Sequence, residues 1–275
     1  NTMTNSKFVQ ITKDQHGREA IMVRVDKTLK ELMEEKHWDP KYFHPNTESI
    51  LDELYSAKYP VEILKKFIGD GSDFITYGQV GKRILVEKSP VRYITTRNIV
   101  DTGLDLISVI KYTPENGWND PERSRPQKSD ILFIGNGVGC AGRVIWLDNA
   151  PPRSNTEQNV VILRPNNINR AYVVIYLKSI FGITQIFRVK DRVGAAYINF
   201  DEIRAIKIPV LPSNVQDHIE SEYKKMSAYH DKAMEGKKKS DEVVYKQNIE
   251  TAEKMLKDLI ARTEAVIRGE RKDVI

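Results

Sequence analysis

The spacing of hydrophobic residues changes character near residue 212. Before this point, short runs of β-branched residues alternate with turn residues, a pattern typical of strands. The expected strands are residues 20–25, 83–86, 91–94, 130–134, 142–146 and 159–163. After Pro212 there is no further proline, and helix-forming residues continue to about Arg268. The pattern therefore predicts a β-rich section followed by long helices.

A few helices are also predicted within the first section. Segments 27–36, 47–57 and 61–67 have helical composition, with Thr47 as the expected N-cap of the second. Residues 37–45 form an aromatic loop bracketed by prolines. The clearest helix is 169–181, because its apolar residues recur at helical spacing; we expect Asn169 to cap it and Gly182 to end it. The predicted fold is a mixed α/β (α+β) domain with a mostly antiparallel, β-rich core, followed by long coiled-coil helices.

The final segment carries a heptad pattern. Six residues recur at alternating spacings of three and four, as in the seam of a coiled coil: Ile249, Ala252, Leu256, Leu259, Thr263 and Val266. A continuous helix over 213–268 would be about 80 Å long at 1.5 Å per residue, so it must pair with something. A second copy of the chain, the preceding helix of the same chain and a different subunit all satisfy the pattern.

Charge is distributed unevenly along the chain. The formal net charge is +5, and the residues between Phe74 and Pro212 hold about 19 Lys and Arg against about 12 Asp and Glu. In the helical tail, about 13 residues of each sign balance. The basic section is also the one rich in turns and loops, where binding residues are usually placed. It permits binding to a polyanion such as nucleic acid without establishing it.

Cysteine usage and hydropathy indicate the cellular compartment of the protein. Cys140 is the single cysteine, which excludes an intrachain disulfide and a zinc site built on several thiolates. No apolar run approaches the roughly 18 residues of a membrane span. The first residues lack the charged and apolar regions of a signal peptide. We therefore expect a cytoplasmic protein without membrane contact.

Residues 135–142 contain the G-x-G-x-x-G spacing of nucleotide-binding loops. A phosphate-binding loop of that kind opens a helix, whereas residues 143–148 prefer a strand and are followed by Asn149-Ala150-Pro151-Pro152. A glycine-rich hairpin is the expected structure. Two roles fit such a hairpin: its backbone amides approach a phosphate, or it is a purely structural turn.

No catalytic or metal-binding motif is found in the sequence. Asn149–Arg153 lacks the spacing and the aromatic residue of an adenine methyltransferase motif, and the nuclease-like Glu222-Tyr223-Lys224 lies on a predicted helix. The histidines show no metal-ligand spacing; they are His16, His37, His44, His218 and His230. We expect no catalytic residue, no metal site and no cofactor.

Several segments, in their order, resemble the DNA-specificity (S) subunits of type I restriction–modification systems. The similarity extends over roughly residues 37–235. It is carried by Gly69–Gly71, Val91–Ile99, Ser129–Gly137, Gly142–Val144, Asn159–Pro165, Tyr172–Ser179 and Ile206–Pro212. Each motif is loose, but the shared order is specific. The resemblance implies a target-recognition domain that binds double-stranded DNA, and helices that space this domain and dock methyltransferase (M) subunits.

The resemblance divides the chain into three regions. Residues 1–36 are an N-terminal extension of unassigned role, 37–212 are the DNA target-recognition domain, and 213–275 are a helical spacer and dimerisation region. A full S subunit has two domain-plus-helix units, whereas this chain has one. It fits a half-sized S polypeptide that forms a homodimer through its helices, or an excised half. The restriction (R) subunit is a further partner that the resemblance allows.

Polar residues in loops of the matching segments are the expected DNA contacts. Arg pairs bidentately with guanine and Asn with adenine, whereas phosphate contacts add affinity without sequence information. Lys82 and Arg83 are expected at phosphates. The full set is Lys82, Arg83, Arg92, Thr95, Thr96, Arg97, Asn98, Asn136, Gly137, Arg143, Arg153 and Asn155.

The expected function is a non-catalytic specificity subunit that directs adenine methylation, and cleavage, by partner subunits. Two other functions fit parts of the pattern. In the first, the chain is the specificity end of a fused methyltransferase or restriction enzyme. In the second, it is a coiled-coil scaffold that does not bind DNA. The scaffold function leaves the basic, loop-rich section unexplained.

Overall fold

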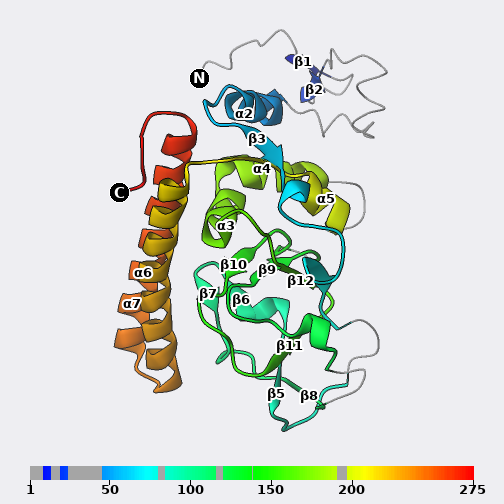
Figure 1. Ribbon diagram of the computed structural model, residues 1–275, viewed down its shortest axis with the longest axis vertical. Helices are drawn as coiled ribbons and strands as arrows, with labels where there is room; N and C mark the ends of the chain where they lie inside the picture. Colours follow the sequence, from blue (N-terminus) through cyan, green and yellow to red (C-terminus); the bar gives the residue numbers. More distant parts are fainter. Residues whose placement is uncertain are drawn as a thin grey trace.

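A β-rich domain packs against one side of a pair of long helices in the computed structural model (Figure 1). The structure describes residues 9–13, 19–23, 45–79, 84–115, 120–137, 139–190 and 197–275. The predicted helix 27–36, nearly all of the aromatic loop, Lys82 and Arg83 lie outside these residues.

The strands are short and the helices are concentrated in the second half of the chain. The strands are β1 Val9–Lys13, β2 Glu19–Val23, β3 Val61–Ile63, β4 Ile75–Tyr77, β5 Val91–Ile94, β6 Ile99–Val100, β7 Gly103–Leu104, β8 Tyr112–Thr113, β9 Ile131–Ile134, β10 Val144–Trp146, β11 Ser154–Thr156, β12 Val160–Leu163 and β13 Lys207–Pro209. The α-helices are α2 Pro45–Tyr55, α3 Arg170–Lys178, α4 Ile180–Lys190, α5 Phe200–Ala205, α6 Ser213–Lys238 and α7 Glu242–Ile267. Single 3-10 turns are η2 Leu64–Lys66, η3 Thr96–Asn98 and η5 Glu122–Ser124.

The main sheet has the strand order β10-β9-β12-β4, and every pair in it is antiparallel. Both faces are buried, which explains why β9 and β12 are apolar at every position rather than at alternate ones. Phe133 and Val161 pack into the core that the helices cover, whereas Leu132 and Ile162 pack into a second core with Ile99. The predicted strands 91–94, 130–134, 142–146 and 159–163 are confirmed to within two residues.

A second sheet, β11-β5-β8, lies at the end of the domain farthest from α2 in Figure 1. Here β11 runs parallel to β5, and β5 runs antiparallel to β8. Smaller antiparallel pairs are β13 with β3, β6 with β7, and β1 with β2. The mixed α/β fold with mostly antiparallel pairing is confirmed.

The predicted helix 169–181 is correct at its start and wrong at its end. Asn169 caps α3, accepting hydrogen bonds from the amides of Ala171 at 3.0 Å and Tyr172 at 3.3 Å. The helix stops at Ser179, whose ψ of 164° is extended, and Gly182 lies inside α4. A Cβ on Gly182 would lie 2.3 Å from the carbonyl oxygen of Tyr176, so this glycine permits close contact between the two helices rather than ending one.

Three other predicted elements differ from the structure. Residues 61–63 form β3, paired with β13, followed by η2, so the predicted helix 61–67 is wrong. Residues 84–86 form no strand; Val86 makes one isolated bridge to Tyr112. Helix α2 begins at Pro45, two residues before the expected cap. In the part of the chain that the structure describes, no single helix has the length and hydropathy to cross a membrane; α3 and α4 meet both criteria only as a pair bent by 70°.

The long helices α6 and α7 contain 26 residues each and fold back on each other as a hairpin (Figure 1). Each is about 39 Å long at 1.5 Å per residue. Ser240, with a φ of 58°, turns the chain, and Asp241 caps α7 by accepting a hydrogen bond from the Val244 amide at 3.0 Å. Ala252, Leu256, Leu259, Thr263 and Val266 are buried along α7, and Ile249 is half-buried. The preceding helix of the same chain is therefore the partner of the seam, with α3 packed beside it.

Candidate functional site

The predicted DNA contacts that the structure describes lie on the second sheet, on the loops around it and on the β9–β10 turn. Three groups differ in their surroundings: side chains buried inside the domain, arginines tied to acidic or carbonyl groups, and Arg97, which is exposed. Asn136 and Gly137 lie apart from them in the β9–β10 turn. Whether each contacts DNA stays a prediction, but their surroundings separate structural from accessible side chains.

Thr95 and Asn98 are buried and cap η3. The Thr95 amide and hydroxyl both donate to Oδ1 of Asn98 at 2.9 Å. The Asn98 Nδ2 group donates to the carbonyl oxygens of Asp105 at 2.8 Å and Val109 at 2.9 Å. These side chains therefore hold the 95–109 loop together. The Thr96 amide is used in the same way, donating to Oε1 of Glu157 at 2.7 Å.

Arg97 lies between these capping residues and is exposed. Among the residues that the structure describes, its guanidinium has no hydrogen-bond or ion-pair partner. Within the described ranges, the η3 turn thus presents a positive charge that no carboxylate balances, on a loop held by the Thr95 and Asn98 hydrogen bonds.

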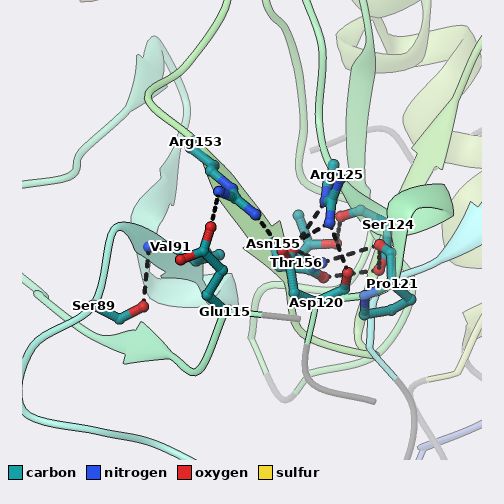
Figure 2. Close-up of polar contacts among 10 residues, drawn as sticks. All are labelled: Ser89, Val91, Glu115, Asp120, Pro121, Ser124, Arg125, Arg153, Asn155 and Thr156. Atoms are coloured by element: carbon teal, nitrogen blue, oxygen red, sulfur yellow. Dashed lines mark hydrogen bonds and ion pairs between the residues drawn. The ribbon is translucent and has the colours of Figure 1, made fainter. Parts of the chain in front are cut away.

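Asn155 on β11 is fully buried in a polar network that Figure 2 shows. Its Nδ2 donates to Oδ1 of Asp120 and to the carbonyl oxygen of Pro121, both at 3.1 Å. Its Oδ1 accepts from the Ser124 hydroxyl at 2.7 Å and from the Thr156 amide at 2.9 Å. All four hydrogen bonds stay within the protein, so Asn155 joins β11 to the 120–124 segment.

Asp120 is the centre of this network, with its carboxylate fully buried. Arg125 donates to both of its oxygens, from Nε at 2.9 Å and Nη2 at 2.8 Å, and Arg153 donates from Nη2 at 3.0 Å. Burial alone raises the pKa of Asp120, but the hydrogen bonds from Arg125, Asn155 and Arg153 outweigh it and hold the pKa below its usual value. Arg153 also pairs with Glu115 through Nη1. Figure 2 shows Arg153 between the two carboxylates.

Two further predicted arginines are half-buried and donate to backbone carbonyl groups. Arg92 on β5 donates to the Leu106 carbonyl oxygen and, at 3.2 Å, to the Tyr112 hydroxyl, while its guanidinium lies 5.2 Å from the Tyr112 ring centroid. Arg143 donates to the Ile99 carbonyl oxygen at 3.0 Å and forms an ion pair with Asp101 at 3.3 Å. Both side chains fix loops of the second core.

Asn136 and Gly137 lie in the turn that joins antiparallel β9 to β10. The turn is therefore a hairpin, as predicted, and not the strand-to-helix loop of a nucleotide site. Gly137 has a φ of 155°, and a Cβ there would lie 2.5 Å from Sγ of Cys140. Asn136 makes an isolated bridge to Tyr197.

Sequence reasoning did not identify Glu115, Asp120, Arg123 and Arg125. They lie between the motif segments, and nothing in their spacing marks them. Arg123 on η5 is exposed and donates to the Thr76 hydroxyl at 3.0 Å and the Tyr77 carbonyl oxygen at 3.4 Å. Across the described residues, no group of three or more His, Cys, Asp or Glu side chains could hold a metal ion.

A comparison with protein families identifies the chain. The sequence model of the type I restriction modification DNA specificity domain matches residues 91–243, more than half of the chain. The chain belongs to this family. The match runs from β5 to the start of α7 and includes the second sheet, strands β9, β10 and β12 of the main sheet, and α6. Members are specificity components, which are non-catalytic targeting subunits.

Solved structures with similar folds include three from type I systems. The S subunit from M. genitalium is 11% identical, with a TM-score of 0.40, over 65% of this chain and 40% of that one. The HsdS subunit from Thermoanaerobacter tengcongensis is 12% identical, with a TM-score of 0.43, over 82% of this chain and 52% of that one. A structure described as the basis of complex assembly and conformational transition of the type I R-M system is 13% identical, with a TM-score of 0.42, over 88% of this chain and 57% of that one. This chain thus spans about half the length of those chains. No curated protein matches it.

Proposed function

We propose that this chain supplies the DNA-sequence specificity of a type I restriction–modification system and directs partner methyltransferase subunits to adenines in its target. The observation that carries the proposal is the family match, because it covers the second sheet, three of the four strands of the main sheet, and α6. Residues 37–212 then act as the target-recognition domain and 213–275 as the helical spacer. Such a subunit works where the chromosome is, in the cytoplasm.

The contacts between hairpin and domain suit a spacer. Tyr223 of α6 bonds to the backbone of Trp146, and Lys237 forms an ion pair with Asp105 at 2.7 Å. His230 lies between these points and bonds through Nδ1 to the Thr102 hydroxyl at 2.8 Å. Three contacts spread along α6 hold the hairpin at a fixed angle, so a methyltransferase docked on it would sit at a fixed distance from the recognition loops.

The accessible cations suit DNA contact better than the buried polar residues do. Arg97 and Arg123 are exposed and, within the described ranges, are not paired with a carboxylate, so we assign them to phosphates. Thr95, Asn98 and Asn155 act indirectly, by fixing the loops that carry the contacts. A homodimer formed through the helices would present two copies of this domain and would favour a split, palindromic target; a restriction subunit would add cleavage.

The test is methylation sequencing of DNA from cells that carry this gene with its neighbouring methyltransferase gene. We expect a modified adenine in a defined motif that disappears when this gene is deleted and returns on complementation. Unchanged methylation after deletion would refute the specificity role and favour a scaffold. A methyltransferase domain encoded in the same reading frame would instead identify the fused form.

A further inference from the structure

Resting on the proposed function, we propose that Arg153 is a sequence-reading residue that donates to the O6 and N7 acceptors of a guanine, and not a phosphate contact. Arg97, Arg123 and Arg153 are exposed arginines of the recognition domain, and the surroundings of Arg153 differ from those of the other two. The difference lies in charge, rigidity and unused donors.

Arg153 is both accessible and fixed in place. Its side chain is 42% exposed, yet Nη2 lies 3.0 Å from Asp120 and Nη1 pairs with Glu115. Asp120 is itself immobilised by Arg125 and Asn155. An exposed arginine normally loses much rotamer freedom when it binds, whereas this one is already ordered. Pre-organisation of this kind favours specific contacts, because less conformational entropy remains to be lost.

The cluster around Arg153 has no net charge. The guanidinium groups of Arg125 and Arg153 are balanced by the carboxylates of Glu115 and Asp120. Phosphate contacts draw their strength from positive charge and counterion release, so a neutral cluster contributes little to them. The Glu115 carboxylate, itself 42% exposed, would also repel an approaching phosphate. Guanine O6 and N7 are uncharged acceptors and carry no such penalty.

Enough donors remain for a bidentate contact. Arg153 uses one hydrogen on Nη1 and one on Nη2 for the carboxylates. Within the described part of the chain, Nε–H and the second hydrogen on each Nη have no acceptor. A planar guanidinium can therefore keep its two carboxylates and still present paired N–H groups to a base edge.

The experiment compares sequence preference with salt dependence in the complex of this chain and its methyltransferase. The wild-type complex first yields the methylated motif, and then binding constants for the motif and for random duplexes across a range of salt concentrations. For Arg153→Ala we expect one G·C position of the motif to lose its preference, with discrimination there falling about tenfold or more. The slope of log K against log salt should stay unchanged.

Three further variants make the test specific. Arg97→Ala is the matched control: the slope should fall in magnitude by about 1 and the motif should stay intact. Arg153→Lys keeps a positive partner for Asp120, and with it the fold, but lacks the planar fork, so it should lose the same G·C preference as the alanine variant. Glu115→Gln gives the cluster a net charge of +1 and should steepen the slope and raise affinity for random duplexes.

The outcomes distinguish a failure of the Arg153 inference from a failure of the proposed function. A normally folded Arg153→Lys complex with the full wild-type motif would overturn the inference, as would an Arg153→Ala complex that loses one unit of salt slope and keeps its motif. An absence of any motif for the wild-type complex would refute the proposed function itself, and the inference with it. Thermal unfolding of each variant identifies loss of folding.

Discussion

The hydroxyl of Tyr223 on α6 bonds to both backbone polar groups of Trp146 on β10. It accepts from the Trp146 amide at 3.1 Å and donates to the carbonyl oxygen at 3.4 Å, while the two rings meet edge to face at 5.5 Å. Because β10 is an edge of the main sheet, these backbone groups have no strand partner on that side. Tyr223 thus protects the sheet edge and attaches the hairpin in one contact.

Removing this hydroxyl should destabilise the protein. Tyr223→Phe leaves the buried Trp146 amide without an acceptor, for which we expect a loss of about 2 kcal/mol in the free energy of unfolding. Urea denaturation followed by circular dichroism measures it. Tyr229→Phe, half-buried on the same helix, is the control and should change stability by less than about 0.5 kcal/mol. Equal effects of the two substitutions would contradict the role of Tyr223.

The ion pair between Asp105 and Lys237 should make the stability of the protein depend on acid pH. Burial raises the pKa of Asp105, but hydrogen bonds from Lys237 and Ser108 and from the Ile107 amide outweigh it, so the pKa lies well below its usual value. A depressed folded-state pKa adds stability that is complete above the unfolded value of about 3.9 and is lost as pH falls below it. Asp105→Asn should cost about 2 kcal/mol at neutral pH and lose less stability than wild type between pH 5 and pH 3.

Lys237→Met provides the second arm of this test. If the pair acts as a unit, the double variant should be less destabilised than the sum of the two single variants. Additive effects, or an unchanged acid dependence in Asp105→Asn, would show that the pair does not stabilise the hairpin contact. Chemical denaturation at each pH gives all the required values.

Asn155 should affect stability and not sequence choice. Asn155→Ala removes four internal hydrogen bonds and leaves Asp120 with one donor fewer, so we expect a loss of about 2 to 3 kcal/mol in the free energy of unfolding. The methylated motif should be the same as in wild type, at lower yield. A changed motif with unchanged stability would restore Asn155 as a base contact.

Gly182 should tolerate no side chain. A Cβ there meets backbone atoms of Tyr176 and Leu177 at 2.3 and 2.5 Å, and backbone cannot move aside as a flexible side chain can. Gly182→Ala should therefore destabilise the protein by about 3 kcal/mol. Gly139→Ala is the comparison: its φ of 77° is strained for alanine, but no atom of the described residues beyond its chain neighbours lies within 4 Å of the added Cβ, so about 1 kcal/mol is expected. Thermal unfolding that ranks the two in the opposite order would contradict the packing argument.

The buried strands were predictable because their signal is local. Strands β9 and β12 are covered on both faces and therefore contain apolar residues at every position. The break at Ser179 was not predictable, because it depends on α4 folding back over α3. Likewise, residues 61–63 are a strand only because β13, far along the chain, pairs with them.

The candidate site was predictable as a region and not residue by residue. A polar residue in a basic loop has the same sequence signal whether it faces solvent, as Arg97 does, or the interior, as Asn98 and Asn155 do. The Thr95-x-x-Asn98 spacing does resemble a capping box, and this pattern would have predicted that both side chains bond within the loop. The pairing of Glu115 and Asp120 with Arg153 joins distant segments, which no local pattern encodes.

The hairpin of α6 and α7 restricts how its length can change. At the end opposite the Ser240 turn, the side chains of His218 and Asp273 bond at 2.7 Å. One turn further along α6, Glu222 pairs with Arg262 of α7 at 3.2 Å. An insertion of one heptad in a single helix would put these pairs out of register, whereas matched insertions on both sides of Ser240 would preserve them. A change in the length of this hairpin must therefore consist of equal insertions or deletions in α6 and α7, at matching positions on either side of Ser240.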